Sequence, residues 1–159
     1  SPRQFTNALN IECHHRTTAP EIYRQRPLRF EMEAFIHGGG TGGTMMGVKQ
    51  FFDEFSWPSK VPQYVLVTPA ESALTHGIQG INDGRDFFIE RDGMDDIIEI
   101  KTQDAIDRAR RLAREMGLMV GISSGANVLA AEQWVEEHSP AGYVMTMLSD
   151  RGERYLSIY

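Results

Sequence analysis

Two spacings of apolar residues recur along this chain. Short runs of consecutive apolar residues are typical of buried strands, and apolar residues at every third or fourth position are typical of amphipathic helices. The first spacing predicts strands at 33–37, 64–68, 97–100, 118–120 and 143–148. The second predicts helices at 18–25, 45–55, 102–116 and 124–138. Alternation of these elements indicates an α/β fold, with a mostly parallel twisted sheet flanked by helices. We find no internal repeat or long linker, so residues 1–159 are expected to form a single α/β domain.

Several element ends can be assigned from residue type. Thr102 is expected to cap the helix that follows it, and Gly117 to end that helix. Ser124 is expected to cap the helix that ends at Ser139-Pro140. The unbroken apolar run at 143–148 predicts a central parallel strand covered on both faces.

The most informative stretch is a glycine-rich loop, His37-Gly-Gly-Gly-Thr-Gly-Gly-Thr44, between a predicted strand and a predicted helix. Glycine allows the backbone to approach a ligand closely, and backbone N–H groups at a helix N-terminus favour an anion. The threonine hydroxyls can donate further hydrogen bonds. The alternative is a turn that only needs flexible residues. We predict that this loop binds a phosphate group.

The loop does not fit the common nucleotide-binding motifs. Residues 38–43 read as G-x-G-x-x-G, but that fingerprint also requires an acidic residue at the end of the next strand. Here that strand ends at Thr68-Pro69, and Glu71 follows only after the turn. A Gly-Lys-Ser/Thr ending is also absent. A phosphate without adenosine fits best.

Five motifs occur in order and cover nearly the whole chain: Gln4-Phe5-x-Asn7 with Asn10, then 15–22, 40–44, 121–127 and 152–157. Together they resemble the second half of the cysteine synthase family, which belongs with cystathionine β-synthase among pyridoxal-phosphate enzymes of fold type II. The segment 80–87 departs from the family pattern. The short connection from Pro69 to Gly80 and the Asp150-Arg151-Gly152 ending look more like the B-type cysteine synthases than the A-type.

The resemblance implies a site and an activity. Gly40, Thr41, Gly42, Gly43 and Thr44 would wrap the phosphate of pyridoxal 5′-phosphate. Ser123 would form a hydrogen bond with the pyridine nitrogen, and Gln4 would lie near the substrate carboxylate. The chain would form the large-domain portion of a homodimeric enzyme that makes L-cysteine from an O-activated serine and sulfide.

The residues around Ser123 leave two roles open. Serine is a favoured helix N-cap, so Ser123 fits a cap as well as a ligand contact. Two serines in tandem can fill both roles, with Ser124 capping and Ser123 facing the cofactor. A neutral hydroxyl would not force a proton onto the pyridine nitrogen, which suits β-replacement better than transamination.

The chain lacks the lysine that such an enzyme needs to form a Schiff base with the cofactor. Its lysines are Lys49, Lys60 and Lys101, and none stands in the setting that the family uses. We therefore expect no catalytic residue here, and interpret the chain as the C-terminal half of a longer enzyme that is inactive by itself. The alternatives are a cystathionine β-synthase-type enzyme and a non-catalytic fragment or binding module that keeps the phosphate loop.

Charge and composition limit the kinds of partner that this chain is expected to bind. A formal charge of −6 argues against nucleic acid. The arginines at 108–114 are expected to form a salt-bridged solvent face, because Asp104 precedes Arg108, and Asp107 precedes Arg111, by four residues. No apolar run is long enough to predict a membrane span.

One cysteine, Cys13, indicates a reducing, cytoplasmic compartment. The adjacent Cys13-His14-His15 cannot easily converge on one ion, so no metal site is expected.

Overall fold

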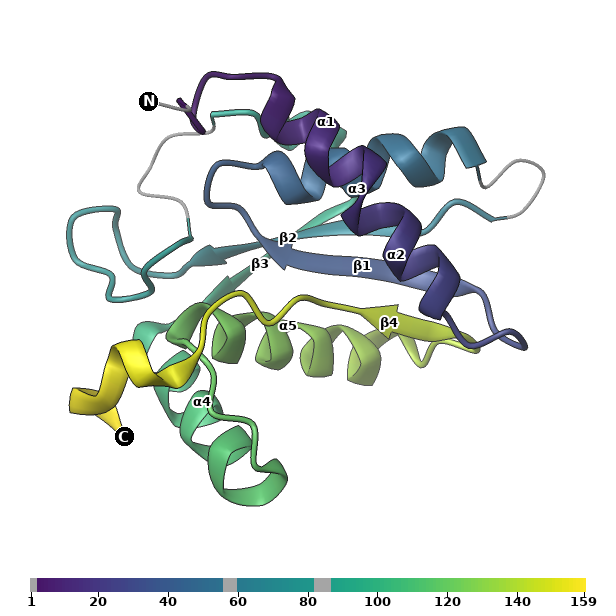
Figure 1. Ribbon diagram of the computed structural model, residues 1–159. Helices are drawn as coiled ribbons and strands as arrows, with labels where there is room; N and C mark the ends of the chain where they lie inside the picture. Colours follow the sequence, from purple (N-terminus) through teal and green to yellow (C-terminus); the bar gives the residue numbers. More distant parts are fainter. Residues whose placement is uncertain (1–2, 56–59, 82–86) are drawn as a thin grey trace.

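The computed structural model describes residues 3–55, 60–81 and 87–159 and contains a four-stranded parallel sheet (Figure 1). The strand order is β3-β2-β1-β4, so β1 lies inside the sheet and β3 and β4 form its edges. The predicted mostly parallel sheet is confirmed. The strands are β1 (Met32–Gly38), β2 (Gln63–Pro69), β3 (Asp96–Ile100) and β4 (Tyr143–Met145).

Helices cover both faces of the sheet. In Figure 1, α1, α2 and α3 lie on one side of the strands, and α4 and α5 lie on the other. The helices are α1 (Leu9–Arg16), α2 (Thr18–Gln25), α3 (Gly43–Phe55), α4 (Thr102–Met116) and α5 (Ile122–His138). Two 3-10 segments, Arg91–Gly93 and Gly152–Ile158, complete the described elements.

The core consists of two main layers separated by the sheet. On one side Phe35 of β1 packs in a buried cluster with Met45 and Phe52 of α3. On the other side Ile36 of β1 packs in a cluster that contains Trp134 of α5. Successive residues of a strand point to opposite faces, so the continuous apolar run of β1 serves both layers.

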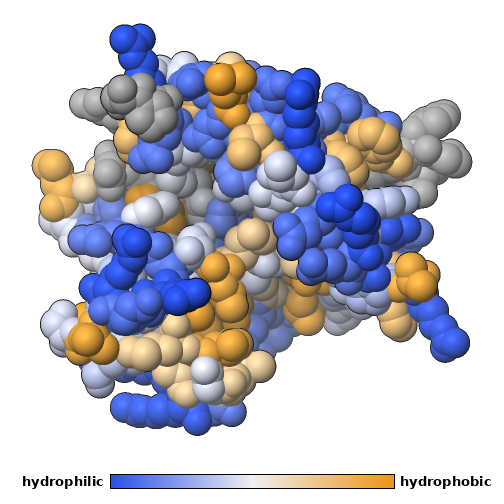
Figure 2. All heavy atoms as spheres, viewed as in Figure 1, coloured by the Kyte–Doolittle hydropathy of each residue, from blue (hydrophilic) through white to orange (hydrophobic). Residues whose placement is uncertain are grey.

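Exposed apolar side chains are dispersed on the face shown in Figure 2, where they form small groups among hydrophilic residues. Single exposed apolar residues are normal for a folded chain. Among the described residues, no helix is long and apolar enough to cross a bilayer.

Helix α1 was not predicted from the sequence. None of its residues is buried, so it has no clear apolar stripe. It instead approaches α3 closely at Gly47, where an added Cβ would lie 2.6 Å from the Cβ of His14 and 2.7 Å from the carbonyl oxygen of Ile11. Tertiary packing on a glycine therefore positions α1.

Two predicted caps are wrong, and one helix end is confirmed. Lys101 is the N-cap of α4, and the Thr102 hydroxyl instead bonds Glu71 and the N–H of Gly77. Helix α5 begins at Ile122 with Gly121 as its N-cap, so Ser124 lies inside the helix. Gly117 ends α4 with φ 69°, as predicted.

Two predicted strands also differ. Residues 118–120 form only an isolated antiparallel bridge, between Val120 and Arg151. The strand at 143–148 shortens to β4, a half-buried edge strand. Consecutive apolar residues therefore did not mark a central strand here.

The arginine pairs of α4 differ from those expected. Arg108 is buried and forms a bidentate pair with Glu132 of α5, at 2.9 and 2.5 Å. Arg111 pairs with Glu115, not with Asp107. The helix therefore uses one arginine for packing on α5, which the i, i+4 spacing did not predict.

We predict that Gly125→Ala destabilises the fold. An added Cβ would lie 2.1 Å from the carbonyl oxygen of Ala105 and 2.9 Å from the nitrogen of Ala109, both backbone atoms of α4. Forcing the two helices apart is expected to lower the free energy of unfolding by about 1–3 kcal/mol, although alanine is the better helix former. Urea denaturation measures the change.

Gly93→Ala is the matched control, because its added Cβ would meet only the Cβ of Glu90 at 3.9 Å. It is expected to change the free energy of unfolding by less than about 0.5 kcal/mol. Equal effects of the two substitutions would contradict the close packing of α4 on α5.

Candidate functional site

A polar cavity of about 160 Å³ lies at the carboxyl end of β1, beside the N-termini of α3 and α5. Parallel α/β sheets usually bind ligands at this edge. The two helix N-termini give the cavity a positive character, and the lining residues that the structure describes include no carboxylate. It is lined by His37, Gly38, Gly40, Thr41, Gly42, Thr44, Gly80, Ile81, Ser123, Asn127 and Ser149.

The glycine loop forms one wall of this cavity and needs its glycines. Gly42 has φ 89°, which side chains rarely adopt, and an added Cβ on Gly40 would lie 2.6 Å from the carbonyl oxygen of Gly80. Gly43 begins α3 and is not part of the lining. The bare backbone and the helix N-terminus together make a cradle that fits a phosphate group.

Thr41 is held so that its proton remains available. Its hydroxyl oxygen accepts hydrogen bonds from Asn10 Nδ2 at 3.0 Å and from the N–H of Gly43 at 3.2 Å. With both acceptor positions used, the hydroxyl proton can be donated into the cavity that Thr41 lines.

Gln4 lies in an exposed turn and is not part of the cavity lining. It is tied to the loop through Asn10, whose Nδ2 donates to the carbonyl oxygen of Gln4 at 2.7 Å as well as to Thr41. The structure thus places Gln4 beside the site and leaves its role toward a substrate a prediction. Asn10 of α1 is a supporting residue whose contacts the sequence did not reveal.

Ser123 lies in the first turn of α5 and lines the cavity together with the glycine loop. This juxtaposition was predicted from the sequence. The Ser123 side chain is buried, and among the described residues no hydrogen bond to its hydroxyl is found. By contrast, Ser124 Oγ accepts the N–H of Ser149 at 3.1 Å. Ser124 therefore has a structural role, whereas the Ser123 hydroxyl is available to bind a ligand.

Asn127 and His37 form a buried network behind the loop. Asn127 Oδ1 accepts the N–H of Gly38 at 2.8 Å, and its Nδ2 donates to the carbonyl of Met147 at 2.9 Å and contacts His37 Nδ1 at 3.1 Å. Burial, with a smaller contribution from the nearby His14, lowers the pKa of His37 to about 4. Sequence reasoning assigned a role to neither His37 nor Asn127, because their contact joins positions ninety residues apart.

His14 supports the other end of the loop. Its Nε2 contacts Thr44 Oγ1 at 3.3 Å, and its Nδ1 contacts Thr18 Oγ1 at 2.9 Å. Burial lowers the pKa of His14 as well. Among the described residues, no cluster suited to a metal ion is present, and His15 instead contacts Glu54 at 3.0 Å.

The three lysines lie outside this cavity. Lys49 pairs with Asp53 at 2.7 Å, Lys60 pairs with Glu33 at 2.5 Å, and Lys101 is exposed at the start of α4. None of them lines the cavity that contains the loop and Ser123.

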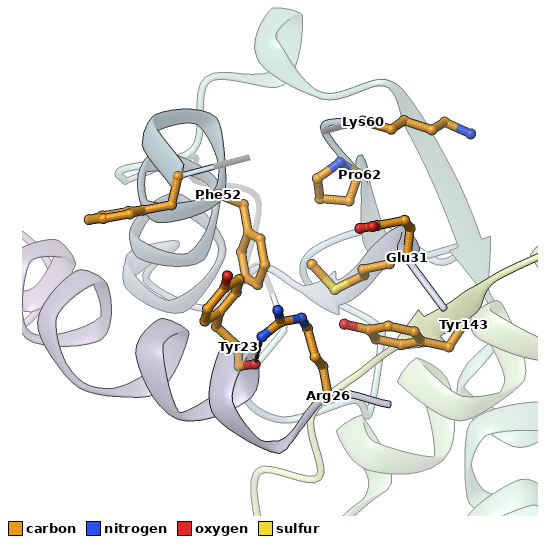
Figure 3. A pocket seen from close by; sticks show the side chains of 9 residues that line it. Tyr23, Arg26, Glu31, Phe52, Lys60, Pro62 and Tyr143 are labelled. Carbon is orange, nitrogen blue, oxygen red and sulfur yellow. Dashed lines mark hydrogen bonds between the residues drawn. The ribbon is translucent and has the colours of Figure 1, made fainter. Parts of the chain in front are cut away.

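A second cavity, of about 70 Å³, lies at the opposite, amino-terminal edge of the strands (Figure 3). Arg26 stacks on the ring of Tyr23 there, 3.6 Å from its centroid. It contains none of the predicted site residues. The departure from the family pattern at residues 82–86 lies outside the described part of the chain.

We predict that acid destabilises the fold through His37. The folded pKa is about 4 and the ordinary value is 6.5, so the folded chain binds fewer protons between these values. The stabilisation by neutral His37 is therefore complete above pH 6.5 and is lost as the pH falls toward 4. It accounts for about 2 kcal/mol of the unfolding free energy lost between pH 7 and pH 5.

Urea denaturation of the parent and of His37→Gln at both pH values measures this difference. Between pH 7 and pH 5, the free energy of unfolding of the variant is expected to fall by about 2 kcal/mol less than that of the parent. His138→Gln, at an exposed site, is the control and is expected to behave like the parent. An identical pH dependence in His37→Gln would contradict the burial of a neutral imidazole.

The chain is similar in sequence to cysteine synthases. The chain is 40% identical over 164 residues to a protein named cysteine synthase B from Campylobacter jejuni, covering 97% of this chain and 52% of the relative. It is 38% identical to a probable cysteine synthase from Bacillus subtilis, covering 98% of this chain and 52% of that protein. The chain thus spans about half the length of these curated relatives.

Solved structures share the fold. A crystal structure of O-ureido-L-serine synthase matches with a TM-score of 0.84 and 36% identity, over 98% of this chain and 50% of that one. An O-acetylserine-dependent cystathionine β-synthase from Helicobacter pylori matches with a TM-score of 0.85 and 29% identity, over 98% of this chain and 52% of that one.

Most of the chain also matches the model of a protein family. Residues 1–150 match the family described as pyridoxal-phosphate dependent enzyme. This match includes the glycine loop, Ser123 and every other residue that lines the cavity. The chain belongs to the family of pyridoxal-phosphate dependent enzymes.

Proposed function

We propose that this chain is the cofactor-binding half of a cysteine synthase, which replaces the activating group of an O-activated serine with sulfide. The observation that supports this most is the position of the Ser123 hydroxyl. It is buried, lacks a hydrogen-bond partner among the described residues, and lines one cavity with a phosphate-type glycine loop.

The cavity fits pyridoxal phosphate on chemical grounds. The phosphate would be held by Gly40–Thr44, where an added Cβ on Gly40 would collide with Gly80 and where the Thr41 proton is available. When bound, the cofactor withdraws electrons from the amino-acid carbon, which allows a β-substituent to be lost and replaced.

The residues of this chain would bind and orient the cofactor and the substrate. Ser123 would contact the ring nitrogen through a neutral hydroxyl, which a carboxylate at the same position would not mimic. Asn10 would hold Gln4 near the loop, where it would meet the substrate carboxylate. The lysine that anchors the cofactor would come from the part that the relatives have in addition.

Two alternatives keep specific support. One structural relative is an O-acetylserine-dependent cystathionine β-synthase, so a thiol amino acid would replace sulfide in that case. The other alternative is a non-catalytic module, because no lysine of this chain lines the cavity. We further propose, from the resemblance and the single cysteine, a homodimer in the cytoplasm.

The test is an assay of the full-length protein that carries this chain. Supplied with pyridoxal phosphate, O-acetyl-L-serine and sulfide, it is expected to release L-cysteine faster than it makes cystathionine from O-acetyl-L-serine and homocysteine. A preference for cystathionine would support the first alternative. Binding of the cofactor without either product would support the second.

We predict that Ser123→Ala in the full-length protein lowers kcat/KM about tenfold or more, because it removes a preorganised contact to the cofactor. The variant is expected to unfold at nearly the parent urea concentration. Ser124→Ala is the matched control. It removes the bond to the N–H of Ser149 and is expected to lower stability by about 1 kcal/mol with a smaller effect on kcat/KM. The reverse pattern would make Ser123 a structural residue.

A further inference from the structure

The proposed function assigns no role to His37, although this residue lines the cavity. It lies near the carboxyl end of β1, three residues before Gly40, and lines the cavity with Thr41 and Thr44. Its side chain is only 7% exposed. A buried imidazole at the edge of a ligand cavity needs a defined arrangement of its protons, since its two nitrogens differ in what they can donate.

Asn127 fixes that arrangement. The carboxamide oxygen must face Gly38, because it accepts an N–H there at 2.8 Å. The carboxamide nitrogen must face the other way, because it donates to the carbonyl oxygen of Met147 at 2.9 Å. The orientation of the Asn127 side chain is therefore determined by two backbone groups of opposite character.

The second proton of Asn127 Nδ2 points to His37 Nδ1, at 3.1 Å. This nitrogen must accept, so it cannot carry a proton. A charged imidazolium, or the Nδ1–H tautomer, would set two donors against each other. His37 is therefore a neutral imidazole whose single proton is on Nε2.

The Nε2–H group is available for a ligand. Among the described residues no hydrogen bond to His37 Nε2 is found, and His37 is one of the residues that line the cavity. The neighbouring groups are those of the phosphate cradle, since His14, which is close enough to influence His37, contacts Thr44 at the start of α3.

We infer that His37 is a further ligand-positioning residue, whose Nε2–H, oriented by Asn127, donates a hydrogen bond to an oxygen of the anion held at the N-terminus of α3. The inference rests on the proposed phosphate site. It assigns to His37 a neutral donor, and to Asn127 the task of keeping that donor in place.

His138 provides an internal control of opposite character. Its Nδ1 contacts the carbonyl oxygen of Trp134 at 3.0 Å, so this nitrogen must carry a proton. It ends α5, whereas Ser123 lies in the first turn of the same helix. At 1.5 Å per residue, His138 is about 20 Å away from the cavity.

Long-range ¹H–¹⁵N NMR of the histidine rings at pH 7 tests the proton arrangement. We expect a protonated Nε2 and an unprotonated Nδ1 for His37, and a protonated Nδ1 for His138. His37→Gln assigns the resonances. A proton on Nδ1 of His37, in either the neutral or the charged ring, would overturn the inference without affecting the proposed function.

The same spectra recorded with inorganic phosphate and with pyridoxine 5′-phosphate, which has no aldehyde to react with lysine, test the contact. We expect both probes to shift the His37 Nε2–H resonance together with the amides of Gly40–Thr44, and to leave His138 unchanged. Shifts of the loop amides without His37 would overturn this inference alone. Absence of any shift would overturn the phosphate site as well.

Affinity gives a second readout. His37→Leu removes the donor and is expected to weaken binding of pyridoxine 5′-phosphate about tenfold, whereas His37→Gln keeps an N–H of similar reach and is expected to weaken it less. Equal losses in the two variants would show that His37 serves packing and not donation.

Discussion

The carboxamide of Asn127 joins three parts of the chain at the place where the ligand cavity forms. It holds the N–H of Gly38 at the end of β1, the carbonyl of Met147 after β4, and the imidazole of His37. The bonds to Gly38 and His37 are buried and the bond to Met147 is partly buried. Leaving one of these groups without a partner would lower the free energy of unfolding by about 1–3 kcal/mol. One side chain of α5 thus sets where the glycine loop leaves the sheet.

Close backbone approach is the second constraint. Helix α5 packs on α4 at Gly125, two residues from both Ser123 and Asn127. Helix α1 packs on α3 at Gly47, which brings Asn10 and His14 to the two threonines of the loop. The walls of the cavity are therefore built before any ligand arrives, which lowers the cost of ordering them on binding.

Much of this architecture could be predicted from the sequence. The apolar runs at 33–37 and 64–68 gave the inner strands, and five glycines between a strand and a helix gave the anion loop. The resemblance implied that Ser123 and the glycine loop share one ligand, and both line one cavity. The strand expected just before Ser123, at 118–120, forms only an isolated antiparallel bridge. Motif order pointed to the family, which the match over residues 1–150 confirms.

The remainder depended on contacts distant in sequence. Helix α1 buries none of its residues, so its sequence has no apolar periodicity that would predict a helix. It nevertheless carries Asn10 and His14, which contact the glycine loop. Thr102 and Ser124 are residue types that often cap helices. Their hydroxyls instead form hydrogen bonds with the Glu71 carboxylate and with the N–H of Ser149. The run at 143–148 is as apolar as a central strand and lies at an edge, because strand order is not encoded in local hydropathy.

The central claim is that the glycine loop and Ser123 hold the two ends of one pyridoxal phosphate. A crystal structure of this chain with pyridoxal 5′-phosphate tests it most directly. The account predicts the phosphate against Gly40–Thr44, and the ring nitrogen within about 3 Å of Ser123 Oγ. A ligand bound instead in the cavity of Tyr23 and Arg26, or with its ring nitrogen far from Ser123, would contradict it.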